Sequence, residues 1–401
     1  MNTRMWMSLD LVGLLLATMA GVSHAGTYYV ATEGSADNDG SYDKPWPSVA
    51  VALEKVGGGN TIVLKRGEYR GPIKVAAEAA GTEKNPTIIK SEKKWEAAIV
   101  GGTGENPALS SDKDCPWVVF DGFEVYGAAA GIWLGGEHNT ARNCWVHNNW
   151  GFDGIGSHSK GAVIESNLIE YNGQNPQFHH GIYADSDGLV VRNNIVRHNA
   201  GFGIHCYSDV KNAYIANNLV YGHVFRPGIL IACSTHVGKN VVVNNTVVDN
   251  AVGIRVSGGN GDKIYNNISV ATKSAVSLDE DTVGTIADYN LCVPASPHQG
   301  PHGLSAEPGF IAPGSFCYWL REDSAARGKG AAEFAPKTDF WGRTRPEDKA
   351  PDLGALPYSP YWADEDTSQP EEMVRGYWGW PYRFARYREI RDLWYLPEGE
   401  K

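Results

Sequence analysis

Short apolar stretches alternate with polar turns over residues 117–290, and both recur at a regular interval. The repeats read RNCWV, SNLIE, NNIVR, NNLVY, NNTVV, NNISV and YNLCV, with asparagines at Asn143, Asn167, Asn194, Asn218, Asn245, Asn267 and Asn290. The intervals between them are 24, 27, 24, 27, 22 and 23 residues. A period of this length is typical of a solenoid in which each repeat forms one coil.

A second marker keeps the same spacing. It is an aliphatic residue, usually preceded by glycine, at Ile132, Ile155, Ile182, Ile204, Ile229, Ile254 and Val276. Apolar residues within a coil alternate with other residues and do not follow helical spacing, so the coils consist of strands. We therefore predict an all-β chain, folded as a single-stranded right-handed parallel β-helix. The recurring asparagines are expected to stack as a ladder that bonds buried backbone groups.

The sequence outside the repeats predicts caps and tails. A short helix at 47–56, followed by strands at 61–64 and 73–75, suits a helical cap over the open N-terminal end of the stack. Residues 371–395 are expected to form an amphipathic helix. The predicted division is a signal peptide at 1–25, the cap and first coils at 26–115, the repeats at 116–290, a closing segment at 291–358 and an aromatic, arginine-rich tail at 359–401.

The first residues have the layout of a cleaved secretory signal. Arg4 precedes the apolar run LVGLLLATMAGV, and small residues lead to a cleavage site near Ala25. The run is shorter than the roughly 18 residues needed to span a bilayer. We therefore expect an exported protein, periplasmic or secreted, without a membrane span after cleavage.

Composition narrows the partners. The formal net charge of -11 argues against nucleic-acid binding. The six cysteines show no CxxC spacing, and Cys292 with Cys317 is the one disulfide we expect. The stretches DNDG at 37 and DSDG at 185 are interpreted as turns, which leaves the metal site unknown and a calcium ion open. A monomer is expected.

Alternation along each strand assigns side chains to two faces. With the aliphatic marker as position zero, positions zero and two point into the core, which makes Cys206 a core residue. Positions one and three face solvent. On successive coils they carry Tyr183 and His205 at position one, and His158, Asp185 and Tyr207 at position three. Because coils are about 4.8 Å apart, these five side chains fit one patch about 10 Å across.

Position minus two adds Asp153 and His180 on adjacent coils, with His179 beside them. If Asp153 and His180 point outward, Asp153 is expected to orient His180 and raise its basicity. The predicted catalytic residues are His158, His180, Tyr183, His205 and Tyr207. The predicted substrate-binding residues are Asp153, His179, Asp185 and Arg255.

The N-terminal TYYVATEGSADNDGS and GNTIVLKRGEY, together with the asparagine coils, resemble the superfamily of secreted right-handed β-helix proteins. That superfamily includes pectate lyases and the chondroitinase B and alginate lyase family, and the resemblance covers residues 27–358. In the alginate lyase family a lysine and an arginine one coil apart act as base and carboxylate neutraliser. Here His158 stands near the lysine's place and Asp185 near the arginine's, so the sequence departs from that pattern.

These features predict an enzyme that acts on an acidic polysaccharide. The leading hypothesis is a lyase that cleaves a uronic-acid polymer by β-elimination, with histidine and tyrosine as base and acid. Epimerisation at the same carbon uses nearly the same groups. A glycoside hydrolase ranks lower, because Asp153 and Asp185 are expected about 17 Å apart, beyond the roughly 5 to 9.5 Å that hydrolases need. A non-catalytic carbohydrate-binding or surface protein is the remaining alternative.

Overall fold

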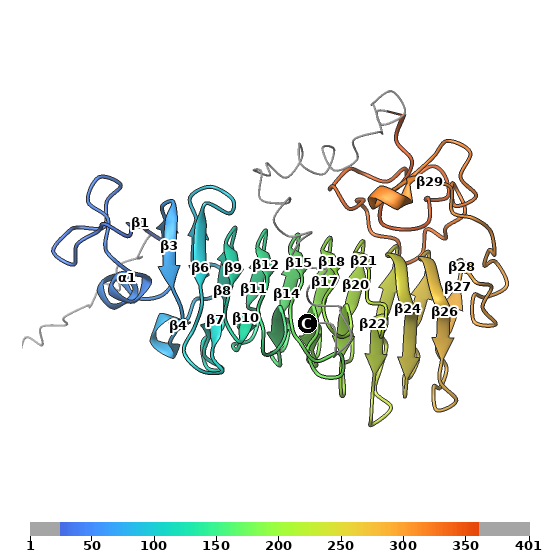
Figure 1. Ribbon diagram of the computed structural model, residues 1–401, viewed down its shortest axis with the longest axis horizontal. Helices are drawn as coiled ribbons and strands as arrows, with labels where there is room; N and C mark the ends of the chain where they lie inside the picture. The colour runs from blue at the N-terminus through green and yellow to red at the C-terminus, as the bar shows by residue number, and fades with distance from the viewer. Residues whose placement is uncertain (1–24, 361–401) are drawn as a thin grey trace, which may run out of the picture.

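The computed structural model describes residues 25–360. The predicted signal peptide and the tail with its expected helix fall almost entirely in 1–24 and 361–401, outside the described residues. Over the described part the chain winds into an elongated right-handed parallel β-helix of about nine turns, as the sequence predicts (Figure 1). No helix in residues 25–360 is long and apolar enough to cross a membrane.

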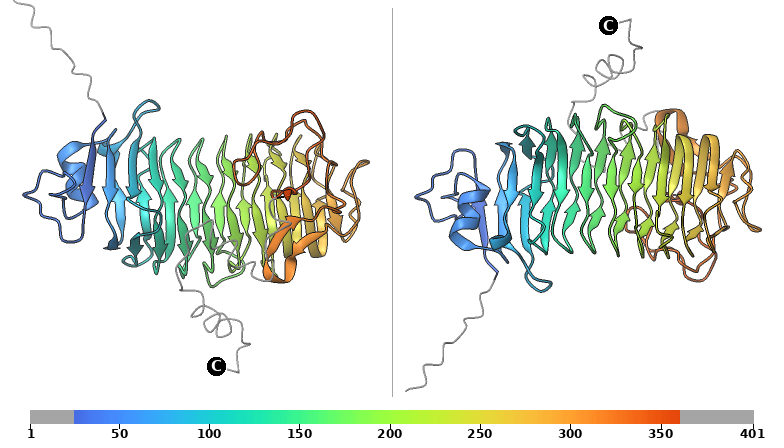
Figure 2. Two further views of the ribbon diagram at one scale, coloured as in Figure 1. Left: turned by 90° about the horizontal axis from the view of Figure 1, so that it is seen from above. Right: turned by 90° about the horizontal axis from the view of Figure 1, so that it is seen from below.

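Most coils contribute three short strands, which stack into three parallel ladders along the molecule (Figure 2). The first ladder is an eleven-stranded sheet of β1 (Thr27–Val30), β2 (Thr61–Leu64), β5 (Thr87–Ser91), β8 (Val118–Asp121), β11 (Thr140–Arg142), β14 (Val163–Glu165), β17 (Val190–Arg192), β20 (Tyr214–Ala216), β23 (Val241–Val243), β25 (Lys263–Tyr265) and β27 (Ile286–Asp288).

The second ladder carries the outward face on which the sequence places the candidate site. It consists of β4 (Ile73–Val75), β7 (Pro107–Ser111), β10 (Ala130–Leu134), β13 (Ile155–Ser157), β16 (Ile182–Ala184), β19 (Ile204–Cys206), β22 (Pro227–Ala232), β24 (Thr246–Ser257) and β26 (Ile268–Leu278). The predicted aliphatic markers pair in register from Ile132 through Val276, and all are fully buried. Cys206 is likewise buried, which confirms its place in the core.

The third ladder lies beside the second and merges with it where the long strands β24 and β26 serve both. Its other strands are β3 (Gly67–Arg70), β6 (Ala97–Val100), β9 (Glu124–Tyr126), β12 (Trp145–His147), β15 (Leu168–Glu170), β18 (Ile195–Arg197), β21 (Leu219–Tyr221) and β28 (Leu291–Val293). The turns between the third and second ladders therefore stack on one side of the molecule.

A helix covers the N-terminal end of the stack, as predicted. Helix α1 (Val49–Val56) begins at Ser48, whose hydroxyl accepts a hydrogen bond from the Val51 amide at 3.2 Å. Val49 and Ala52 are buried in the main core cluster, in which Ile62 of β2 also takes part. The helix thus shields apolar side chains that the first coil would otherwise expose.

The predicted asparagine ladder is present from Asn167 to Asn290. Asn194 is representative: its amide nitrogen donates to the Ile164 carbonyl at 2.9 Å and to Asn218 Oδ1 at 3.0 Å. The prediction was wrong for one member of the asparagine ladder, Asn143. Asn143 lies one residue before the ladder position, with φ of 57°, and Cys144 occupies that position instead, where its amide donates to Asn167 Oδ1. The sequence RNCWV is offset by one residue from its neighbours.

A second row of stacked asparagines, which the sequence did not suggest, runs through the turns that join the strands of the third ladder to those of the second ladder. We call this row the second asparagine ladder. Asn149, Asn172, Asn199 and Asn250 are fully or almost fully buried and bond along it. His223 takes the asparagine's place on one coil, with Nδ1 at 2.9 Å from Asn250 Oδ1. This histidine therefore belongs to the architecture.

The closing segment packs along the side of the last coils. It contains the antiparallel hairpin of β29 (Phe310–Ala312) and β30 (Cys317–Leu320), and short 3-10 turns occur at Pro313–Ser315 and, near the N-terminus, at Ala77–Ala79. Carbonyl groups of Thr338 and Gly354 accept hydrogen bonds from Asn217 and Asn244. The expected Cys292–Cys317 disulfide is absent from the described chain: all six cysteines are free thiols buried in the packed interior.

Candidate functional site

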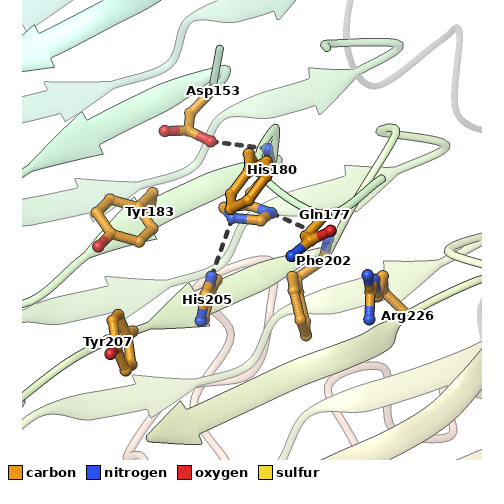
Figure 3. A pocket seen from close by; sticks show the side chains of 9 residues that line it. Asp153, Gln177, His180, Tyr183, Phe202, His205, Tyr207 and Arg226 are labelled. Carbon is orange, nitrogen blue, oxygen red and sulfur yellow. Dashed lines mark hydrogen bonds between the residues drawn. The ribbon is translucent and has the colours of Figure 1, made fainter. Parts of the chain in front are cut away.

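A hollow of about 420 Å³ opens on the second ladder, where the sequence places its patch (Figure 3). Its floor is formed by outward side chains of β16 and β19 and the residue after β19. Its wall is formed by four successive turns, 148–154, 171–181, 198–203 and 222–226, which we call the wall turns. The lining residues are Asp153, Gln177, Phe178, His180, Tyr183, Phe202, His205, Tyr207 and Arg226.

The second asparagine ladder fixes the wall turns. Each turn begins with a residue of positive φ followed by the ladder residue, as in Tyr171 and Asn172. Within the third turn, Gly201 allows a close approach, because a Cβ there would lie 2.6 Å from His180 Nδ1. Buried hydrogen bonds therefore join the wall turns of successive coils to one another.

Asp153 is a buried carboxylate at the upper edge of the hollow. Its Oδ1 accepts a hydrogen bond from the backbone amide of His180 at 2.7 Å, and the other oxygen points away from His180 (Figure 3). Burial raises the pKa of Asp153 to about 7, although the hydrogen bond from the His180 amide acts to lower it. Asp153 therefore gains and loses a proton near neutral pH.

His180 is almost fully buried, and both of its ring nitrogens have partners. Nδ1 accepts from the Phe202 amide at 3.3 Å, and Nε2 lies 3.0 Å from His205 Nδ1. Burial, with repulsion from His205, lowers the pKa of His180 to about 2. The expectation that Asp153 raises the basicity of His180 was wrong, because the carboxylate binds the backbone amide and the ring is cut off from water.

The pair of histidines has one consistent proton arrangement when both are neutral. Since His180 Nδ1 accepts a hydrogen bond, its proton is on Nε2 and is donated to His205 Nδ1. The proton of His205 is then on Nε2, which points away from His180 (Figure 3). Burial and the nearby Arg226 lower the pKa of His205 to about 4, so the ring is neutral at pH 7. His205 thus presents an N–H donor to the hollow.

Two tyrosines complete the floor. Tyr183 pairs in register with His205, and their ring centroids are 5.4 Å apart, as the sequence predicts for neighbouring coils. Burial is the main cause that raises the pKa of Tyr183, and the negative charge of Asp185 raises it further. The phenol therefore stays protonated at neutral pH. Tyr207 stacks on His205 at 5.7 Å and is half exposed. Both hydroxyl groups can donate to a bound molecule.

Arg226 is the cation of the hollow, and sequence reasoning missed it. It immediately precedes β22, its Nε donates to the Pro176 carbonyl at 2.9 Å, and its guanidinium lies 5.5 Å from the Phe202 ring centre. The predicted substrate-binding residue Arg255 lies on β24, two strands beyond His205, and forms a bidentate ion pair with Asp279. Arg255 does not line the hollow.

His158, Asp185 and His179 lie around the hollow but are not among its lining residues. His158 Nδ1 is 2.6 Å from Asp185 Oδ1, and this hydrogen bond raises the pKa of His158. The His158 ring also meets the edge of Tyr183 at 5.8 Å. His179 Nδ1 accepts the backbone amides of Gln174 and Asn175, so this ring stabilises its own turn.

Among residues 25–360 no three His, Cys, Asp or Glu side chains are grouped so that they could hold a metal ion. The described residues therefore do not fit a calcium centre of the kind that clustered carboxylates provide.

The fold and its coils define the class of protein. Residues 28–195 match a family model described as the Pel9A-like right-handed β-helix region. The chain is a right-handed parallel β-helix protein, and residues 28–195 are similar to the pectate lyase-like superfamily of that fold.

Particular relatives can be named within that class. Pectate lyase PEL9 of Emericella nidulans is 30% identical over 172 residues, 38% of this chain and 41% of the relative. Pectate lyase L of Dickeya chrysanthemi is 31% identical over 147 residues, 32% of this chain and 33% of the relative. Each match thus spans less than half of the pectate lyase. The uncharacterized protein YwoF of Bacillus subtilis is 24% identical over 324 residues, 67% of this chain and 68% of the relative.

Solved structures share the architecture. The pectate lyase Pel9A superposes with a TM-score of 0.56 and 19% identity over 84% of this chain and 98% of its own. A rhamnogalacturonan lyase gives a TM-score of 0.52 and 16% identity over 72% and 91%. At these identities the likeness is one of fold.

Proposed function

We propose that this protein is a polysaccharide lyase that cleaves a uronic-acid polymer by β-elimination in the hollow. The observation that carries the proposal is that Asp153, a carboxylate that titrates near neutral pH, lines the same hollow as the cation Arg226 and several proton donors. The pectate lyases among the relatives support this class of substrate.

Asp153 is proposed as the base. Elimination begins with removal of the proton on the carbon next to the carboxylate of the sugar, and a base with a pKa near the working pH is best suited to this. The pKa of Asp153 is about 7, and one of its oxygens is fixed by the His180 amide. The other oxygen is then positioned to accept the proton.

Arg226 is proposed to bind the carboxylate of the reacting sugar. The proton next to a carboxylate becomes acidic only when a nearby positive charge offsets the negative charge that develops. Arg226 lines the same hollow as Asp153, whereas Arg255 is committed to Asp279 outside it. Arg226 also counters the repulsion that a chain with a net charge of -11 exerts on an acidic polymer.

Tyr183 is proposed as the acid. As Asp153 takes the proton, a carbon–carbon double bond forms, the bond to the bridging oxygen breaks, and that oxygen receives the phenolic proton. The raised pKa of Tyr183 keeps this proton in place at neutral pH. His205 Nε2–H and the Tyr207 hydroxyl are available to hold the sugar by hydrogen bonds. His180 acts through His205 as a positioning residue.

A screen of acidic polymers tests the proposal. The protein is incubated with pectate, alginate and glycosaminoglycans, and the ultraviolet absorbance of an unsaturated uronide is followed. Asp153→Asn should lower the rate by about a hundredfold or more, whereas Asp279→Asn on the same face but outside the hollow should retain it. Below pH 7 the rate should fall as Asp153 becomes protonated.

Other outcomes separate the alternatives. Inverted sugars without absorbance would identify an epimerase. New reducing ends without absorbance would identify a hydrolase, although the hollow is lined by a single carboxylate. An Asp153→Asn protein of undiminished activity would disprove the assignment of the base.

A further inference from the structure

Exposed apolar side chains gather around the hollow. Residues 25–360 contain ten exposed large apolar side chains, and six of them lie between residues 150 and 225. Four are aromatic side chains of the wall turns, namely Trp150, Phe152, Phe178 and Phe225, which we call the aromatic rim. Their exposed fractions are 46%, 41%, 62% and 63%. Exposed apolar side chains that gather in one region of a surface are a feature of interaction sites.

The aromatic rim is continuous with the hollow. Phe178 belongs to both, and the wall turns that carry the rim also supply Asp153, His180 and Arg226 to the lining. The bond from Arg226 to the Pro176 carbonyl ties the fourth wall turn to the second. The second and fourth wall turns, which carry Phe178 and Phe225 of the aromatic rim, are therefore joined by this hydrogen bond.

The direction of the rim follows from the solenoid. The wall turns come from four successive coils, so the rim extends along the axis over three coil spacings, about 14 Å. A hollow of about 420 Å³ lies at the small end of ligand sites. A polymer with one unit in the hollow extends beyond it, and the aromatic rim lies at one edge of the hollow.

We propose that the aromatic rim binds further sugar units of the same polysaccharide, so that the protein favours long chains over short ones. This inference rests on the proposed function. Flat aromatic rings present large apolar surfaces at little entropic cost, and the C–H faces of sugar rings fit such surfaces. Arg226 in the hollow and apolar rings outside it match a ligand that is charged at its carboxylates and apolar on its ring faces.

Binding of oligosaccharides of different length tests the proposal. In an Asp153→Asn background, which prevents turnover, Kd is measured for disaccharides and hexasaccharides of galacturonate and of mannuronate–guluronate. We expect the hexasaccharide of the preferred sugar to bind at least about tenfold more tightly than the disaccharide. Trp150→Ala with Phe225→Ala should abolish most of that ratio. Val283→Ala, which removes an exposed apolar side chain far from the hollow, should leave it unchanged.

The outcomes distinguish this proposal from the proposed function. Lyase activity with a length ratio that survives the rim substitutions would overturn the rim proposal alone. A length ratio that depends on the rim in a protein without lyase activity would overturn only the proposed function. Absence of binding at every length would overturn both. A concentration-dependent dimer in light scattering that the rim substitutions dissociate would reassign the rim to self-association.

Discussion

His180 shows how one buried side chain can set the chemistry of another. Both of its nitrogens are engaged inside the wall, so it does not exchange protons with a substrate. Its contribution is to hold His205 in the form that has its proton on Nε2. A histidine in the opposite form would present an acceptor to the hollow instead of a donor.

The proton arrangement can be measured directly. In protein labelled with nitrogen-15 in histidine, at pH 7, His205 should show a protonated Nε2 and an unprotonated Nδ1, and should stay neutral down to about pH 4. His158 serves as the internal control, because its bond to Asp185 raises its pKa and it should titrate above the ordinary value. A His205 protonated on Nδ1 at neutral pH would contradict the assignment.

The sequence located most of the lining but not its electrostatics. Strict alternation places Tyr183, His205 and Tyr207 outward, and the marker register brings them together. Whether a side chain is shielded from water depends on how the wall turns fold, which alternation does not describe. This is why His180 was expected to be basic. Phe202 stands at position minus two like His180 and could have been found by extending that count, whereas Arg226 has no such signal.

At the scale of the element, the asparagine ladder joins each coil to the next. Asn194→Ala removes an amide that bonds Ile164 and Asn218 and accepts from Asn167, all in the buried interior. The loss should lower the free energy of unfolding by about 1 to 3 kcal/mol, with activity per folded molecule preserved. Urea denaturation provides the measurement. Asn106→Ala, at an exposed turn, is the control, and equal stability of the two variants would refute the role of the ladder.

The repeats made the asparagine ladder predictable from the sequence. Coils that depart from the repeat limited how many of its members could be assigned correctly. A stack of coils repeats the same backbone requirement, so the same residue type recurs and the register can be counted. Cys144 and His223 fill ladder positions without being asparagine, and Cys144 shifted the predicted ladder member to the neighbouring Asn143. A ladder position is defined by the left-handed residue before it, which the sequence shows only indirectly.

Acid stability is a property of the whole molecule. Burial lowers the pKa values of His180, His205 and His223 to about 2, 4 and 4, so the unfolded chain binds three more imidazole protons than the folded chain at pH 5. Asp153 acts in the opposite direction, because its pKa of about 7 lets the folded chain hold one extra proton. The free energy of unfolding should therefore fall by about 1 to 3 kcal/mol per pH unit between pH 6 and 4.5.

Urea unfolding across this pH range measures the effect. His223→Asn, which restores the usual ladder residue, should reduce the pH dependence by about 1.4 kcal/mol per pH unit and leave the hollow intact. A pH dependence identical to that of the parent protein would show that His223 is not held neutral by the fold.

The wall turns have one more consequence, which concerns how such a molecule can be rebuilt. Asp153, His180, Phe202 and Arg226 come from four consecutive coils, one from each. Duplication or deletion of a coil outside residues 148–226 would change the length of the solenoid but leave the distances between these four side chains unchanged. A coil inserted between them would move base and cation apart by about 4.8 Å. The hollow is therefore built by four consecutive coils together. Transferring it into another solenoid requires that all four coils be transferred as one continuous segment.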